Sequence, residues 1–338
     1  MKAPFPWFGG KSRVAADVWQ RFGYDVQNYG EPFCGSLAVP LGRPGGAGPN
    51  ETVNDKDGFV CNFWRAIQAD PEAVAHYADW PVNENDLHAR HAWLKPRRAE
   101  LSARLEGDPD YFDAKIAGWW VWGISVWIGG GFCGDSHRGA GPWVVEDGML
   151  VNGGQLAGVT RGMPSLHDRG MHRKRPMIGK GGHGITRQRI QTSCDNGING
   201  QTDIYGWFAT LSDRLRRVRV CCGDWRRILG QSPTTAIGMT AVFLDPPYGA
   251  DTGRDRDLYS EDSGTVAAEV RDWAVENGDN PLLRIALCGY EGEHQMPDSW
   301  ECLYWTANGG MANQGDSREN RRRERIWFSP ACLKARLF

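Results

Sequence analysis

The sequence lacks several features that would assign it to a familiar class at once. Its most apolar stretch, residues 116–131, is interrupted by glycines and is too short to span a bilayer. The opening residues, MKAPFPWFGGKSR, contain no long apolar run of the kind found in a secretory signal. A formal net charge of −2 does not indicate a polyanionic partner for the molecule as a whole. We therefore expect a cytoplasmic protein without membrane contact.

Cysteine pairs with metal-binding spacing are also missing from the sequence. The chain has nine cysteines, yet none forms a CxxC pair, and only Cys221 and Cys222 stand close together. No zinc-ligand spacing follows from this pattern, and a disulfide framework is not expected in a chain of 338 residues. We predict reduced cysteines and no metal site.

Helical and strand patterns alternate in the first and last parts of the chain. Helical spacing of apolar residues predicts helices over 13–23, 59–70, 204–218 and 265–277. Apolar runs bounded by turn residues predict strands within 25–33, 51–58, 219–225, 240–248 and 282–290, and a final edge strand over 324–330. This alternation predicts an α/β fold with a Rossmann-like, doubly wound and mostly parallel sheet.

The middle of the chain has a different character. A charged helical run over 84–106 precedes a Trp-rich helix near 111–128. We expect a core position for the tryptophans of that helix, namely Trp119, Trp120, Trp122 and Trp127. A tract rich in Gly, Arg and His follows over 129–200, and its length without a regular pattern predicts a functional loop. We therefore predict one α/β domain, residues 1–79 and 203–338, with an inserted region over 80–202.

The stretch AVFLDPPYGA, residues 241–250, ends a buried strand on a carboxylate. Ligands of open α/β sheets bind at the carboxyl ends of the strands. Two prolines fix the backbone and remove competing N–H donors. Asp245 and the carbonyl of Pro246 thereby form a rigid row of acceptors, and Tyr248 supplies an aromatic face for stacking. This arrangement suits the exocyclic amino group of a planar base.

The N-terminal motif PWFGGKSR, residues 6–13, is not a phosphate-binding loop. The first glycine that such a loop requires would fall at Phe5. Gly9 and Gly10 instead allow a close backbone approach. Trp7 offers an apolar wall, and Lys11 offers a positive charge for a carboxylate. The motif is typical of the rim of a cofactor site.

A second glycine-containing motif, EPFCGS at residues 31–36, follows the first predicted strand. Strand-to-helix turns of this kind bind cofactors through backbone donors. About twenty residues further on, Asp55 ends the second strand, where a carboxylate can accept hydrogen bonds from ribose hydroxyls. Leu37 and Pro40 in the following stretch predict a short or irregular helix after the turn.

The motifs PWFGGK, EPFCGS and DPPY, in this order, resemble those of the Dam-type (D12 class) DNA adenine-N6 methyltransferases. The resemblance covers residues 1–75 and those after 203. It implies a class I methyltransferase fold, S-adenosylmethionine as the cofactor, and an inserted target-recognition region over 80–202. The catalytic residues that it implies are Asp245, Pro246 and Tyr248. The cofactor-binding residues that it implies are Trp7, Gly9, Gly10, Lys11, Glu31, Pro32, Phe33, Gly35, Asp55, Asp224, Trp225 and Asp245.

Two basic segments, 161–189 and 317–327, favour contact with phosphates. The first contains a single acid, Asp168, among many arginines, lysines, histidines and glycines. We predict DNA contacts by Arg161, Arg169, Arg173, Lys174, Arg175, Lys180, Arg187, Arg189, Arg321, Arg322 and Arg323. The expected partner is double-stranded DNA, bound by a monomer or weak dimer.

The DPPY motif leaves the exact substrate open. Cytosine N4 or adenine in RNA presents the same kind of amino group, and a catalytically inactive nucleic-acid-binding protein would share the fold. Methylation of a protein glutamine fits this sequence less well, since Asn rather than Asp would be expected before the two prolines. The inserted region contains no pattern that specifies a recognition sequence.

Overall fold

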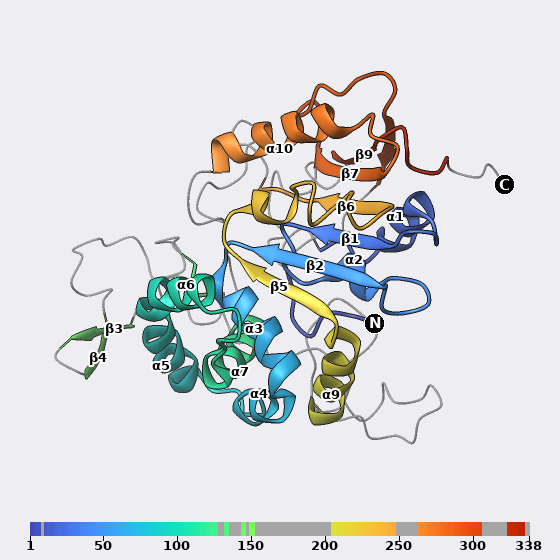
Figure 1. Cartoon of the computed structure of the whole chain (residues 1–338). Helices are drawn as coiled ribbons and strands as arrows, with labels where there is room; N and C mark the ends of the chain where they lie inside the picture. The colour runs from blue at the N-terminus through green and yellow to red at the C-terminus, as the bar shows by residue number, and fades with distance from the viewer. Residues whose placement is uncertain are drawn as a thin grey trace.

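The computed structural model of the chain describes residues 1–7, 10–127, 132–134, 143–146, 149–152, 204–247, 263–305 and 323–334. Its centre is a seven-stranded sheet with the order β5-β2-β1-β6-β7-β9-β8 (Figure 1). The strands are β1 (Asn28–Glu31), β2 (Asn50–Asp55), β5 (Val218–Cys222), β6 (Thr240–Leu244), β7 (Leu283–Tyr290), β8 (Glu301–Tyr304) and β9 (Glu324–Phe328).

The sheet is mostly parallel, which confirms the predicted α/β class. Parallel pairing joins each strand to the next in the series β5, β2, β1, β6 and β7. Strand β9 pairs antiparallel with both β7 and β8, so it alone among the seven described strands runs in the opposite direction. The prediction that residues 324–330 form an edge strand is wrong, because β9 lies inside the sheet and β8 forms the edge. All five residues of β9 are buried, as its interior position requires.

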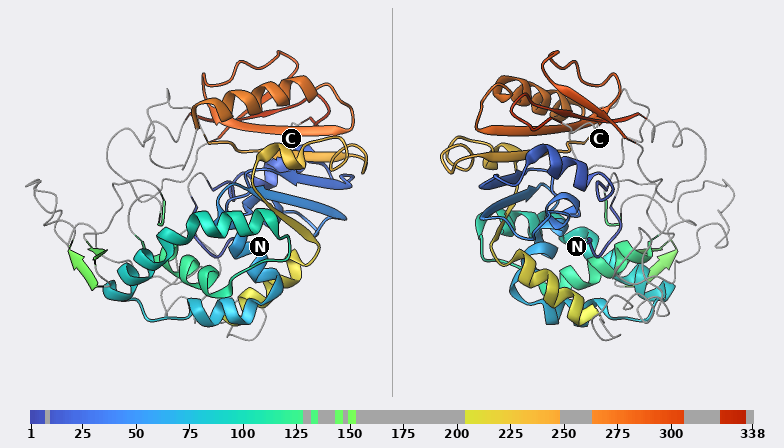
Figure 2. Two further views of the ribbon diagram at one scale, coloured as in Figure 1. Left: turned by 60° about the vertical axis from the view of Figure 1, so that its left-hand side comes forward. Right: turned by 90° about the vertical axis from the view of Figure 1, so that its right-hand side faces the viewer.

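Helices cover both faces of this sheet. Helix α1 (Ala15–Phe22) packs on one face, where Val18 and Phe22 meet Phe243 and Phe328. Helix α10 (Ser263–Asn277) packs on the other face, together with the short helix η4 (Trp225–Ile228). The two faces are distinct because successive side chains of a strand point to opposite sides. The arrangement is the layered one expected for a doubly wound sheet (Figure 2).

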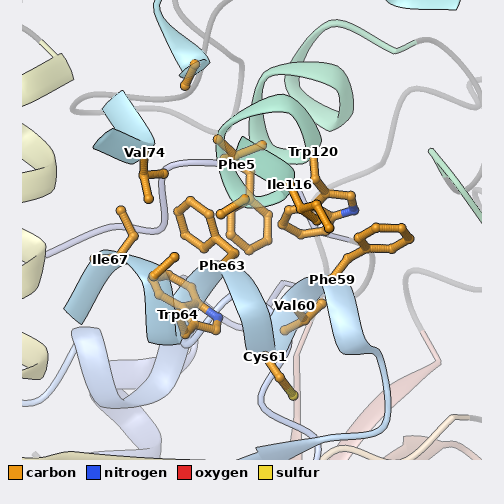
Figure 3. Close-up of a cluster of buried hydrophobic side chains, with 14 of the residues drawn as sticks. Phe5, Phe59, Val60, Cys61, Phe63, Trp64, Ile67, Val74, Ile116 and Trp120 are labelled. Atoms are coloured by element: carbon orange, nitrogen blue, oxygen red, sulfur yellow. The ribbon is translucent and has the colours of Figure 1, made fainter. Parts of the chain in front are cut away.

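A second group of helices packs beside β2 and β5 at one end of the sheet (Figure 1). It consists of α3 (Gly58–Ala69), α4 (Pro71–Ala78), α5 (Glu84–Leu94), η1 (Lys95–Arg97), α6 (Arg98–Gly107), α7 (Ala114–Val126) and α9 (Ile204–Leu215). Figure 3 shows the aromatic centre of this group, where Phe5, Phe63 and Trp120 lie together. Helix α7 is the predicted Trp-rich helix: Trp120 and Trp122 are buried and Trp119 and Trp127 are partly buried.

Several elements differ from the sequence-based expectation. The predicted charged run over 84–106 divides into α5, η1 and α6, and α4 and β8 were not predicted. Within the tract 129–200, β3 (Trp143–Glu146) and β4 (Met149–Asn152) pair as a two-stranded antiparallel ladder. Helices α5–α7 pack in one core with α3 and α9, while the division of the chain at residues 80 and 202 stays a prediction. None of the described helices is long and apolar enough to cross a membrane.

Candidate active site at the carboxyl edge of the sheet

The predicted site residues lie where the parallel strands end, at what we call the carboxyl edge of the sheet. Glu31 ends β1, Asp55 ends β2, and Asp245 directly follows β6. Strand order reverses between β1 and β6, since β2 and β5 lie beyond β1 whereas β7, β9 and β8 lie beyond β6. Ligands of open α/β sheets bind in the crevice at such a reversal. Asp245 and Glu31 therefore flank the position that the topology favours for a ligand.

Three charged side chains form a compact group at this edge, which we call the charge cluster. Lys11 Nζ lies 2.9 Å from Asp245 Oδ2 and 3.6 Å from Glu324 Oε2. The side chains of Lys11 and Glu324 are 3% and 2% exposed, whereas Asp245 keeps 19% of its surface open to solvent. Burial by itself lowers the pKa of Lys11, but the two carboxylates more than offset this effect and raise its pKa above the usual value. Lys11 is therefore a fixed positive charge.

The DPP segment, residues 245–247, directly follows β6, which ends at Leu244 and is therefore shorter than the predicted strand over 240–248. Phe243 and Ala241 face α1, and Asp245 shares this face because side chains alternate along a strand. Pro246 is buried and Pro247 is partly buried. Tyr248, the predicted stacking partner, lies outside the described residues, as does Gly9 of the N-terminal motif.

Asp55 connects the end of β2 to the EPFCGS turn. One of its carboxylate oxygens accepts a hydrogen bond from Gly35 N at 2.9 Å, and the other accepts from Asp57 N at 2.9 Å. Burial raises the pKa of Asp55 to about 6, although the backbone donors act in the opposite direction. Carboxylate oxygens have further lone pairs, so these two bonds leave Asp55 able to accept from a ligand hydroxyl.

The two glycine-containing motifs meet at Gly35. A Cβ atom at this position would lie 2.3 Å from Trp7 Nε1, and the backbone adopts φ +42°, so only glycine fits without displacing the indole. Trp64 Nε1 also donates a hydrogen bond to Gly35 O at 2.9 Å. Leu37 takes the left-handed conformation at φ 53°. Helix α2 (Ala38–Leu41) after it has four residues, which confirms the expected short helix.

Glu31 is a buried carboxyl group at the reversal point. It is 3% exposed, and Tyr29 donates its hydroxyl to Glu31 Oε2 at 3.0 Å. Burial raises the pKa of Glu31 well above its usual value, and the nearby negative charges of Asp245 and Asp55 raise it further. Glu31 thus differs from Asp245, which lies in the same region but is paired with an ammonium group.

An aromatic pair joins the ends of β1 and β5. The rings of Phe33 and Trp225 lie 6.2 Å apart at an angle of 32°. Trp225 is 6% exposed, and its Nε1 has no hydrogen-bond partner among the described residues. Asp224 is more than half exposed and caps η4 by accepting from Arg226 N at 2.8 Å. The result is an apolar wall with an accessible carboxylate at its rim.

Two residues of this edge were not identified from the sequence. Asn54 is fully buried, and its Nδ2 donates to Pro32 O at 3.1 Å and to Gly223 O at 3.0 Å. It thereby ties together the turns that follow β1 and β5. Glu324 completes the charge cluster from β9. Glu324 carried a signal in the sequence, since it is a charged residue at the start of a mostly apolar strand. Asn54 lies in β2, a largely polar strand, and does not stand out there.

The predicted DNA contacts lie almost entirely outside the described residues. These are Arg161, Arg169, Arg173, Lys174, Arg175, Lys180, Arg187, Arg189, Arg321 and Arg322. Arg323 is described: it is partly buried, its guanidinium donates to Glu291 O at 3.2 Å, and it lies over the ring of Tyr290. Within the described ranges, no group of three or more His, Cys, Asp or Glu residues is arranged to hold a metal ion.

No protein-family model matches the sequence of this chain, and no curated protein is significantly similar to it.

Proposed function

We propose that this protein is a DNA methyltransferase that moves a methyl group from S-adenosylmethionine to N6 of adenine. The observation that carries the proposal is the position of Asp245, an accessible carboxylate at the strand-order reversal, followed by two prolines and held by the buried Lys11. The open, mostly parallel sheet is compatible with a class I methyltransferase fold, and residues 80–202 would then supply target recognition. Double-stranded DNA is the proposed partner.

The residues around the edge fit the chemistry of the cofactor. Asp55 offers acceptors for ribose hydroxyls, Phe33 and Trp225 offer apolar surface for a purine, and Asp224 offers an acceptor for its amino group. When bound, S-adenosylmethionine supplies a sulfonium methyl group that a nitrogen lone pair can attack. A contact between Lys11 and the carboxylate of the cofactor stays a prediction, since the Lys11 ammonium already lies against two carboxylates of the protein.

Asp245 and Pro246 would act on the target base as acceptors. An aromatic amino group has its lone pair delocalised into the ring, and two acceptors bound to its hydrogens favour a tetrahedral nitrogen with a free lone pair. The base must leave the duplex to reach this edge, and Tyr248 is the proposed stacking partner. Correct placement of two reactants contributes about 7–11 kcal/mol to such a reaction, so no covalent enzyme intermediate is required.

Asp245→Asn tests the proposal directly, because it keeps the shape of the side chain and removes its charge. We expect transfer of labelled methyl groups into unmethylated DNA to fall by about two orders of magnitude or more. Asp213→Asn is the matched control, since Asp213 is an exposed carboxylate on α9 that pairs with Arg216. Full activity of Asp245→Asn would contradict the mechanism.

The same assay separates the remaining candidates. Digestion of the product to nucleosides distinguishes N6-methyladenine from N4-methylcytosine, and an RNA substrate tests the RNA alternative. Calorimetric titration with S-adenosylmethionine distinguishes an enzyme from a nucleic-acid-binding protein that has lost catalysis, since the latter predicts no cofactor binding or no turnover.

A further inference from the structure

The reversed direction of β9 brings an additional carboxylate to the carboxyl edge. Parallel strands deliver their last residues to this edge, whereas β9 delivers its first residue, Glu324. Glu324 shares a face of β9 with Ile326 and Phe328, which pack against α1. Lys11 lies just before α1 on the same side, and Asp245 follows β6 on that side. The fold therefore places all three charged groups on one face of the sheet.

We propose that Glu324 is a positioning residue that sets the orientation and the charge of Asp245 through Lys11. Glu324 is 2% exposed, so a substrate cannot reach it without a rearrangement, whereas Asp245 is open to solvent. We therefore expect Glu324 to act on Asp245 through the ammonium group of Lys11, which contacts both carboxylates. The inference rests on the proposed methyl transfer, in which Asp245 is the acceptor.

The charges of the cluster explain why a second carboxylate matters. A buried one-to-one pair between Lys11 and Asp245 would neutralise the carboxylate and weaken it as an acceptor for an amino group. Glu324 draws on the same ammonium at 3.6 Å, so the three groups carry one net negative charge. Asp245 then keeps acceptor strength while Lys11 still fixes its position.

Three other groups lie near the charge cluster, but none of them is a second carboxylate in contact with Lys11 among the described pairs. Glu31 ends β1, and Cys288 on β7 is fully buried; burial raises the pKa values of both. Lys11 Nζ also lies 5.6 Å from the centre of the Trp305 ring, which follows the carboxyl end of β8. Of the described carboxylates, Asp245 and Glu324 are the two whose oxygens lie within 4 Å of Lys11 Nζ.

Glu324→Gln removes the charge and keeps the shape. We expect kcat for methyl transfer to fall about tenfold, while KM for DNA changes less than about twofold. Because Glu324→Gln removes a negative charge beside the Lys11–Asp245 pair, we expect the acid limb of the pH–rate profile to move to lower pH.

Two variants provide the controls. Glu291→Gln removes a carboxylate that directly follows β7, pairs with Arg325 of β9 at 2.7 Å and is 59% exposed, so it differs from the buried Glu324. We expect it to retain the wild-type kcat and acid limb. Glu324→Asp keeps the charge on a shorter side chain and should lower kcat while leaving the acid limb in place. It also carries the test if Glu324→Gln does not fold.

A measurement that does not depend on catalysis separates this inference from the proposed function. Crystal structures of the wild type and of Glu324→Gln report the orientation of the Asp245 carboxylate directly. In Glu324→Gln, this carboxylate should turn away from its wild-type position, in which Oδ2 lies 2.9 Å from Lys11 Nζ. A wild-type enzyme without methyl transfer would overturn the proposed function, whereas the orientation of Asp245 would still decide the role of Glu324. An unchanged Asp245 carboxylate, wild-type kcat with an unshifted acid limb in Glu324→Gln, or a shifted limb in Glu324→Asp would overturn the inference.

Discussion

Arg214→Met should lower the free energy of unfolding by several kcal/mol, about 3–5 kcal/mol for a buried ion pair that loses one partner. Arg214 on α9 donates from two guanidinium nitrogens to Glu51 on β2, at 2.7 and 3.1 Å, and from one of them to Pro40 O at 2.6 Å. The side chains of Arg214 and Glu51 are 5% and 1% exposed. This contact links a helix that follows the predicted insertion to a strand that precedes it.

The expected magnitude follows from burial. Removing one partner of a buried, hydrogen-bonded ion pair costs about 3–5 kcal/mol, because the other charge stays buried without compensation. Glu51 keeps a hydrogen bond from Gly48 N at 3.0 Å and a longer contact with Arg43 at 3.4 Å, which favours the lower end of that range. Arg216→Met is the control: its pair with Asp213 is exposed, and we expect a loss of at most about 0.5 kcal/mol.

Urea denaturation followed by circular dichroism measures both values. We expect the midpoint to fall in Arg214→Met with an unchanged slope. The double variant Arg214→Met/Glu51→Leu should lose less than the sum of the single variants, since it removes both charges of the Arg214–Glu51 pair, while Arg43 keeps its hydrogen bond to Val26 O. A loss below about 1 kcal/mol in Arg214→Met, or strict additivity in the cycle, would refute the reasoning.

Three further predictions concern the candidate site. Gly35→Ala should lower the free energy of unfolding by about 1–3 kcal/mol, and by more than Gly45→Ala, because both positions have positive φ but only at Gly35 would the added Cβ meet Trp7. Asp55 has a folded-state pKa of about 6 against an ordinary value of 3.8, so the folded protein holds the proton more tightly than the unfolded chain. The free energy of unfolding should therefore fall as pH rises from about 4 to about 6. Asp55→Asn should flatten that part of the pH–stability profile, and an unchanged profile would contradict the assignment. Lys11 has a raised pKa, so its contribution to stability is present below its unfolded pKa of 10.5 and is lost as pH rises through the higher folded value. Lys11→Met should therefore destabilise the fold at pH 7, because it leaves the carboxylates of Asp245 and Glu324 without the ammonium that they share; wild-type stability of this variant in urea denaturation would count against the charge cluster.

Much of the carboxyl edge could be predicted because strand ends obey a local rule. Asp245, Asp55 and Glu31 each stand at or directly after the end of a predicted strand, and parallel strands bring such ends together. The contact between Lys11 and Glu324 could not be predicted in the same way. It depends on β9 running antiparallel to β7, and the sequence of a five-residue strand does not indicate its direction in the sheet.

The position of β9 in the sheet was mispredicted for a related reason. ERIWF, with a proline two residues after it at Pro330, is consistent with an edge strand, and only the pairing with β8 makes it interior. Strand β8 has four residues, ECLY, three of them partly buried and one exposed, so its pattern gives little signal. Asn54 was missed because an amide in a strand carries no indication of which loops it will join.

The direction of β9 also has a consequence for synthesis. A nascent chain presents β1, β2, β5, β6 and β7 before residue 324 has been added. Until then β7 has an open backbone ladder on one side, which is a template for association with other chains. Translation that stops before β9 would yield a sheet with Lys11 and Asp245 but with an unprotected flank, and we expect such fragments to aggregate or to be degraded.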